Sequence, residues 1–219
     1  MIDLQPIWLS LRLALLTTAL LLALSLPLAW WLAYAKFWGK GVVEALISLP
    51  LVLPPTVLGF YLLLAFSPEH AFGHFIEKHF NIRVAFSFPG ILIASVIYSL
   101  PFMVHPLRSG LRNLPPSLRE AAYTLGKSPR VTLWRVLLPN IRPSLGAGLV
   151  LSFAHTLGEF GVVLMVGGNI PGVTRVASLA LYDEVQAMHY PTANMYAGIL
   201  LVLSFFILLG VSLFRHDPL

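Results

Sequence analysis

Long runs of apolar residues without a charged side chain dominate the pattern of this chain. Four runs contain no Asp, Glu, Lys or Arg, and a fifth, 143–166, is interrupted only by Glu159. A helix rises about 1.5 Å per residue, so about 20 such residues cross a hydrocarbon core about 30 Å thick. The pattern therefore predicts an all-α membrane protein with about five transmembrane helices. The expected spans are 10–35, 43–66, 85–107, 141–166 and 191–214.

Composition strengthens this prediction. Of the 219 residues 58% are hydrophobic and 11% are charged, whereas a soluble domain is about 25% charged. The N-terminal segment has Asp3 and lacks the basic region that opens a secretory signal, so we expect the first span to be retained and residues 1–219 to form a single transmembrane domain. The absence of cysteine excludes a disulfide scaffold, a thiolate metal site and a cysteine nucleophile.

Basic residues gather on one side of the expected spans. With the N-terminus outside, ten of the 14 Lys and Arg residues fall in inner segments and four in outer ones. Because inner loops are enriched in Lys and Arg, this distribution predicts an outside N-terminus and a cytoplasmic C-terminus. Seven of the ten lie in the single inner segment 108–142. The net charge of +5 therefore indicates orientation, and we expect no nucleic-acid partner.

Prolines lie inside three of the expected spans. They are Pro27, the pair Pro54-Pro55, and Pro101 with Pro106. Each removes a backbone donor and favours a kink, and the freed backbone groups need polar neighbours or water. Proline is also common in membrane helices in general. Several prolines in so short a chain favour helices that line a conduit.

The inner loop 108–140 has the pattern of a short helix followed by a glycine turn. Ser117 and Glu120 have the spacing of a capping box, in which the Ser117 hydroxyl accepts from the Glu120 N–H. Gly126 suits the position just beyond a helix C-terminus.

A second short helix is predicted directly after this turn. Ser128-Pro129 supplies an N-cap and a proline for the first helical position. We expect this helix to run to Leu138 and to stop at Pro139. The loop is thus predicted to be a compact helix-turn-helix.

The same loop resembles the EAA loop of permease subunits of bacterial ABC importers. The matching residues are Glu120-Ala121-Ala122, Gly126, Val136 and Leu138-Pro139, with isoleucine usual in place of Val136. The resemblance implies a type I ABC importer permease fold with a cytoplasmic coupling loop that docks in a cleft of an ATPase subunit. The expected coupling residues are Ser117, Arg119, Glu120, Ala121, Ala122, Gly126, Leu138 and Pro139. The alternative is a solvated basic connector beside anionic membrane lipid.

The resemblance also implies partners and a location. Two copies of the chain are expected to form a homodimer around a central path in the bacterial cytoplasmic membrane. Separate ATPase subunits use ATP-Mg, so this chain is expected to be no enzyme and to bind no cofactor. A periplasmic or lipoprotein binding protein would select and deliver the substrate.

Further segments resemble the permeases of the molybdate, sulfate and tungstate family. The proline-rich stretch 49–60 looks like the molybdate members, while Gly158-Glu159-Phe160-Gly161 and 167–172 are shared with sulfate and tungstate permeases. The resemblance implies a tetrahedral divalent oxyanion as substrate, with molybdate favoured and sulfate or tungstate as the alternative.

Such an anion needs a weakly polar path that never holds it tightly. Neutral donors are available inside the spans, and none of the spans carries a buried Lys or Arg. The candidate path or gate residues are Pro54, Pro55, Thr56, Ser95, Ser99, Ser152, Thr156, Glu159 and, just beyond the fourth span, Asn169.

The fourth expected span has a small-residue row for close helix packing, formed by Ser144, Gly148 and Ser152. His155 and Glu159 continue the same face. We expect His155 to be a hydrogen-bonded packing residue without a metal. Glu159 is expected near the outer end, where it satisfies backbone donors or a partner helix, because a charged carboxylate facing the path would repel an oxyanion.

Rival interpretations use the same residues. An ion-driven secondary transporter would use Glu159 as its proton site. An intramembrane enzyme would use Ser152, His155 and Glu159 as a triad, although no oxyanion hole is visible.

Two loops offer weaker alternatives. The segment 167–174 has the glycine spacing of a P-loop but lacks its lysine, so it is expected to be a loop or re-entrant segment near the outer gate. The histidines and glutamates of 69–79 are expected on an exposed amphipathic segment that touches the binding protein, with metal binding as the alternative.

Overall fold

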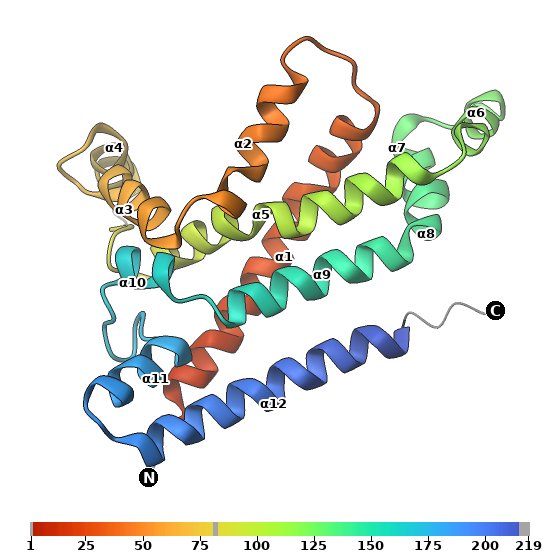
Figure 1. Cartoon of the computed structure of the whole chain (residues 1–219). Helices are drawn as coiled ribbons and strands as arrows, with labels where there is room; N and C mark the ends of the chain where they lie inside the picture. Colours follow the sequence, from red (N-terminus) through yellow and green to blue (C-terminus); the bar gives the residue numbers. More distant parts are fainter. Residues whose placement is uncertain (1, 81–82, 215–219) are drawn as a thin grey trace.

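A computed structural model describes residues 2–80 and 83–214. In this part of the chain helices, joined by turns and short loops, are the only regular secondary structure, and there is no strand (Figure 1). The helices are α1 (Gln5–Tyr34), α2 (Lys40–Val52), α3 (Pro55–Phe66), α4 (Ala71–Phe80), α5 (Phe88–Asn113), α6 (Pro116–Thr124), α7 (Pro129–Thr132), a π-helical turn (Leu133–Leu137), α8 (Leu138–Asn140), α9 (Arg142–Leu157), α10 (Gly161–Gly167), α11 (Ala177–Gln186) and α12 (Tyr190–Phe214). The all-α prediction is confirmed.

The centre of the fold is the packing of α5 against α1 and α9. Small residues bring α5 and α9 together, since a Cβ on Gly110 would lie 2.5 Å from Ser144 Oγ and one on Gly148 would lie 3.0 Å from Met103 Sδ. This agrees with the small-residue row expected in the fourth span. Without a hydrophobic driving force between helices in lipid, such close approach is a main source of helix association.

Three helices are long and apolar enough to cross a membrane, and up to five crossings result if each of two bent helix pairs counts as one. The straight candidates are α1, α5 and α12, which match the first, third and fifth expected spans. Prolines inside helices do not interrupt them: α1 continues through Pro27, and α5 continues through Pro101 and Pro106 to Asn113.

The second expected span, 43–66, is wrong as a single helix. It divides into α2 and α3, which meet at an angle of 113°. Leu53 and Pro54 between them are extended, because a residue before proline avoids the helical region and Pro54 itself precedes Pro55. The proline pair therefore breaks the span instead of kinking it.

The fourth expected span, 141–166, is also wrong in its limits. Helix α9 ends at Leu157, and α10 begins only at Gly161. At its other end α9 is bent by 82° from the segment Pro129–Asn140, with which it forms the second bent pair. The residues Gly158, Glu159 and Phe160 thus interrupt the helix, with Gly158 at the C-terminal end of α9.

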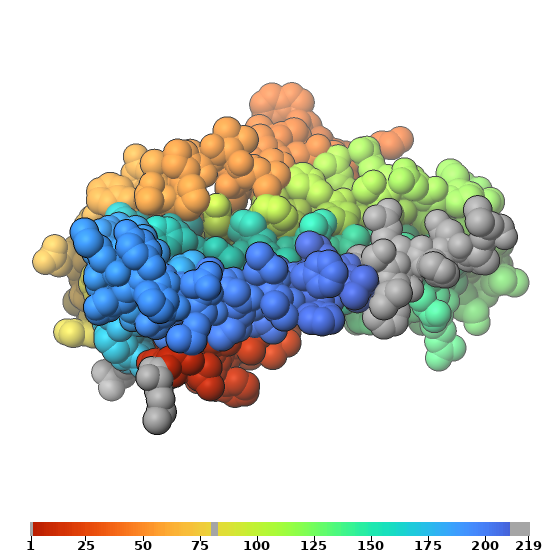
Figure 2. Space-filling model, turned by 60° about the horizontal axis from the view of Figure 1, so that its bottom comes forward, coloured from red at the N-terminus to blue at the C-terminus, as the bar shows by residue number. Residues whose placement is uncertain are grey.

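The two ends of the molecule differ in structure. The start of α1 lies at the same end as α3, α4, α10 and α11, whereas α6, α7 and α8 lie at the opposite end, toward which α12 runs (Figure 1). The space-filling view shows α12 as an outer ridge running along the molecule (Figure 2). The described ends of the chain therefore lie at opposite ends of the fold (Figure 1).

Gly110→Ala should destabilise the protein because its methyl group would overlap Ser144, and overpacking of this kind costs about 1–3 kcal/mol. The check is the melting temperature of the purified chain in detergent. Gly146→Ala is the matched control, because a Cβ there meets no atom within 4 Å. Equal melting temperatures for Gly110→Ala and the wild type would contradict the close packing of α5 and α9.

Candidate functional site

The first helix of the inner loop is α6, and its start differs from the prediction. Pro115 is the N-cap and makes no side-chain cap hydrogen bond, and Pro116 occupies the first turn. The capping box of Ser117 with Glu120 is therefore wrong, because Ser117 already lies inside the helix. The proline pair, with its fixed φ, starts the helix earlier than the Ser117 pattern indicated.

The end of α6 agrees with the prediction at Gly126. Its φ of +70° is left-handed, the Gly126 N–H donates to Tyr123 O, and the Lys127 N–H donates to Ala122 O. These two bonds form a Schellman motif, which glycine adopts without strain. The turn after α6 is thus fixed by the backbone.

The second helix of the loop begins as expected and ends later than expected. Ser128 Oγ accepts from the Val131 N–H at 3.4 Å, with Pro129 in the first turn. Pro139 does not stop the helix, which runs on to Asn140 through a π-helical turn. A π-turn widens the backbone ahead of Pro139, where an α-helical hydrogen bond has no donor.

Apolar burial anchors the loop to the membrane helices. Leu133, Leu137 and Leu138 are buried in one cluster with Leu107 and Leu111 of α5. This cluster ties the π-helical segment, the stem of the loop, to the membrane helices, and α6 packs against the stem.

A second connection runs from α6 to the end of α1. The Arg119 guanidinium lies 4.4 Å from the centre of the Tyr34 ring, and the Tyr34 hydroxyl donates to Leu111 O at 2.9 Å. A cation over an aromatic face is attracted by the ring quadrupole. The expected coupling residue Arg119 therefore links α6, α1 and α5.

The outer face of the loop exposes the residues expected to couple, and three more. Glu120 and Ala121 are exposed, while Ala122 and Leu138 are buried beneath them. Tyr123, Leu125 and Trp134 are exposed by 43%, 75% and 63%. The sequence reasoning missed these three as surface contacts, although large apolar residues within a polar loop were a usable signal.

A cavity of about 490 Å³ lies at the break of the second span, where α3 meets the junction of α9 and α10. Among its lining residues are Pro55, Thr56, Tyr98, His155 and Glu159. Gly161 lets α10 approach closely, since a Cβ there would lie 2.8 Å from Pro55 Cβ. The two interruptions of helical structure, at 53–54 and at 158–160, therefore lie next to each other at this cavity.

Glu159 is buried, with 4% of its surface exposed. Among the described residues neither carboxylate oxygen has a hydrogen-bond partner, whereas the backbone carbonyl of Glu159 accepts from the Ser178 hydroxyl at 2.6 Å. The expected hydrogen bonds from backbone donors to its carboxylate are not found among the described residues, and contact with a partner helix, the other expectation, stays a prediction. Glu159 thus forms part of the cavity wall, while its carboxylate oxygens are enclosed by protein.

The remaining path candidates are not on the cavity wall. Ser95, Ser99, Ser152 and Thr156 are buried between α5 and α9, and Ser99 Oγ bonds to Thr156 Oγ1 at 3.0 Å and to His155 Nδ1 at 2.9 Å. His155 is a hydrogen-bonded packing residue, as expected. Contact between these hydroxyls and an ion requires the helices to separate, so their role in a path stays a prediction.

Two candidates lie elsewhere. Pro54 is exposed in the break before α3. Asn169, at a φ of +55°, donates to both carboxylate oxygens of Asp183 at 2.9 Å and accepts from Arg175 at 3.2 Å. Asn169 therefore fixes the loop 167–174 against α11 at the end where α1 begins.

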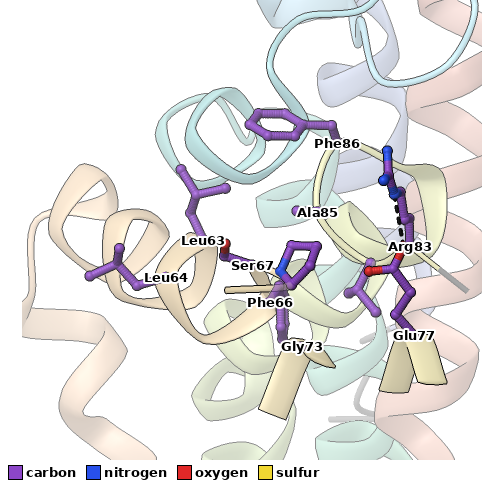
Figure 3. Close-up of a pocket in the computed structure, with 11 residues that line it drawn as sticks. Leu63, Leu64, Phe66, Ser67, Gly73, Glu77, Arg83, Ala85 and Phe86 are labelled. Carbon is purple, nitrogen blue, oxygen red and sulfur yellow. Dashed lines mark hydrogen bonds and ion pairs between the residues drawn. The ribbon is translucent and has the colours of Figure 1, made fainter. Parts of the chain in front are cut away.

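The expected amphipathic segment 69–79 corresponds to α4, which is largely exposed. Between α3, α4 and the segment 83–86 lies a cavity of about 430 Å³, in which Arg83 Nε donates to Glu77 Oε1 at 3.0 Å (Figure 3). This hollow is on the outer end of the fold by the orientation expected from the basic residues.

Comparison with known proteins identifies the family. The chain is 45% identical, over 95% of its own length and 92% of the relative's, to the molybdenum transport system permease protein ModB of Azotobacter vinelandii. It is 37% identical, over 85% of its length and 67% of the relative's, to the sulfate transport system permease protein CysT of Salmonella typhimurium.

The fold is that of the type I ABC importer permeases. A solved bacterial ABC transporter involved in the import of the acidic polysaccharide alginate matches 98% of this chain and 80% of its own with a TM-score of 0.80, at 17% identity. A family model described as binding-protein-dependent transport system inner membrane component matches residues 25–218. The chain belongs to this family of inner-membrane transport components.

Proposed function

We propose that the chain is the permease subunit of an ATP-driven importer of molybdate. The observation that carries this proposal is the 45% identity to a molybdenum permease across almost the whole chain. The rigid exposed loop supports it, because an importer driven by separate ATPase subunits needs a surface that receives their motion. Bond chemistry then belongs to those subunits, which use ATP-Mg, and this chain binds no cofactor of its own.

The proposed orientation places the N-terminus outside and the C-terminus in the cytoplasm. It is supported by the distribution of Lys and Arg and by the common position of the basic loop and the last turns of α12 at one end of the fold (Figure 1). A periplasmic or lipoprotein binding protein would then dock at the end formed by α3, α4 and α11. Two copies of the chain would form the homodimer that encloses the path.

Motion would pass from the ATPase to the path through the two connections of the loop. The stem of Leu133, Leu137 and Leu138 moves α5, and the Arg119 contact with Tyr34 moves α1. Since α5 packs on α9, displacement of the loop shifts the walls of the cavity at the span breaks. Alternating access follows when these packed helices change between two arrangements.

Uptake assays identify the substrate. Proteoliposomes with the complete transporter should take up labelled molybdate, with unlabelled molybdate competing at least tenfold better than sulfate, about 1.4 kcal/mol in binding. Tungstate is the second competitor. Preferred competition by sulfate would instead assign the chain to sulfate, as the relative CysT suggests.

Glu120→Lys should lower uptake and substrate-stimulated ATP hydrolysis by about tenfold, because it reverses a charge on the exposed face of the coupling loop. Glu120→Gln removes the charge without reversing it, at nearly the same side-chain volume, and should retain more of the uptake and ATP hydrolysis than Glu120→Lys. Undisturbed coupling in Glu120→Lys would count against the docking role of α6.

Thr56→Val should reduce molybdate uptake about fivefold, since it removes the hydroxyl from the wall of the cavity at nearly constant volume. Thr56→Ser keeps the hydroxyl and should retain most of the uptake. If the two variants behave alike, the hydroxyl makes no contact with the transported ion.

A further inference from the structure

A second polar cavity lies at the loop end of α5. Its volume is about 430 Å³, and its lining residues are His105, Arg108, Ser109, Arg112 and Asn113. All five come from the last turns of α5, and all five offer hydrogen-bond donors. In contrast to the cavity at the span breaks, its lining contains no carboxylate.

One face of α5 connects the two cavities. Tyr98, Phe102, His105, Ser109 and Arg112 follow one another at steps of four and three residues, so they lie along a single helix face. Tyr98 lines the first cavity, and His105, Ser109 and Arg112 line the second. The Phe102 ring stacks on His155 with ring centres 4.0 Å apart, so a packed aromatic contact separates the two cavities.

An acidic residue on α2 partly neutralises the second cavity. Arg108 Nη2 contacts Glu44 Oε1 at 2.5 Å, with the two side chains 16% and 27% exposed. His105 Nε2 lies 3.1 Å from Ser48 Oγ of the same helix. Among the described residues Arg108 Nε is buried without a partner. Glu44 thus pairs with Arg108 alone among the ion pairs of the described residues, and the second guanidinium group, that of Arg112, leaves the cavity with an excess of positive charge.

We propose that this cavity is an exit subsite for the transported anion, a divalent tetrahedral oxyanion held by Arg108 and Arg112. The subsite rests on the proposed function. Guanidinium groups bind oxyanions through paired N–H donors, and Ser109 and Asn113 add neutral donors. Glu44 competes with the anion for Arg108, so the subsite attracts the anion past the aromatic contact and then releases it.

Equilibrium binding of sodium molybdate to the full chain in phosphatidylcholine nanodiscs tests the subsite. Arg112→Gln should weaken binding about tenfold through loss of one charge-assisted contact. Glu44→Gln should tighten binding several-fold, because it removes the competitor for Arg108. Lys36→Gln, a matched loss of one exposed cation outside the cavity, should bind as the wild type does.

Arg112→Gln and Glu44→Gln are expected to change the affinity for molybdate in opposite directions. Misfolding would weaken binding in both variants, so it cannot imitate the expected result. Absence of saturable binding, or equal binding by Arg112→Gln and Lys36→Gln, overturns the subsite. Unchanged affinity in Glu44→Gln overturns the competition. Arg108→Gln leaves Glu44 without its ion pair and is therefore read only together with its melting temperature, with weaker binding in a folded protein supporting the assignment.

The phosphate of an anionic lipid has the same tetrahedral oxyanion chemistry. Nanodiscs containing phosphatidylglycerol distinguish the two sources. Molybdate affinity that is unchanged by phosphatidylglycerol supports a subsite for the transported anion. Loss of molybdate binding as phosphatidylglycerol is added assigns the cavity to lipid and overturns the proposal.

Transport measured separately keeps the two proposals distinct. If the complete transporter imports molybdate while Arg112→Gln and Glu44→Gln bind it as the wild type does, the exit subsite fails and the importer function stands. If the complete transporter imports no oxyanion, the importer function fails, whatever the binding measurements show.

Discussion

Close packing of α5 against α1 and α9 holds the rest of the structure in place. At Gly110 and Gly148 the helices approach within a distance that a side chain would prevent. Helix α5 also contributes Tyr98 to one cavity, all the lining residues of the other, and Leu107 and Leu111 to the cluster of the coupling loop. One packed interface therefore joins the features on which transport depends. In lipid this packing replaces the hydrophobic driving force that water would supply.

The coupling loop combines a stiff interior with an accessible surface. Its stem is buried against α5, its first helix is closed by a Schellman turn, and its outermost residues include Leu125 and Trp134. A surface of this kind transmits displacement instead of absorbing it. The π-helical turn at Leu133–Leu137 fits the same role, because it carries the chain to Pro139 without a break and lets the stem reach α9.

The two cavities differ in chemical character. The one at the span breaks is lined mainly by neutral residues such as Thr56 and Tyr98, and the one at the loop end contains Arg108 and Arg112. An anion moving between them would leave a weakly polar surrounding for a basic one, and Glu44 limits how tightly the basic one holds it. Such a sequence of weak sites favours passage over retention, which is what conduction requires.

The sequence by itself determined the membrane character, the helical class, the inner loop with its Gly126 turn, and the family resemblance, since these depend on local composition and spacing. The sequence-based predictions of a continuous helix in the second and fourth spans were wrong, because the length of an apolar run does not show whether the helix bends within it. The predicted capping box of Ser117 was wrong because the preceding proline pair starts the helix earlier. Only the tertiary structure decided that the breaks at Pro54 and Gly158 meet, that Glu159 is buried there, and that Arg108 pairs with Glu44. These relations join residues far apart in the chain, and packing between helices alone brings them together.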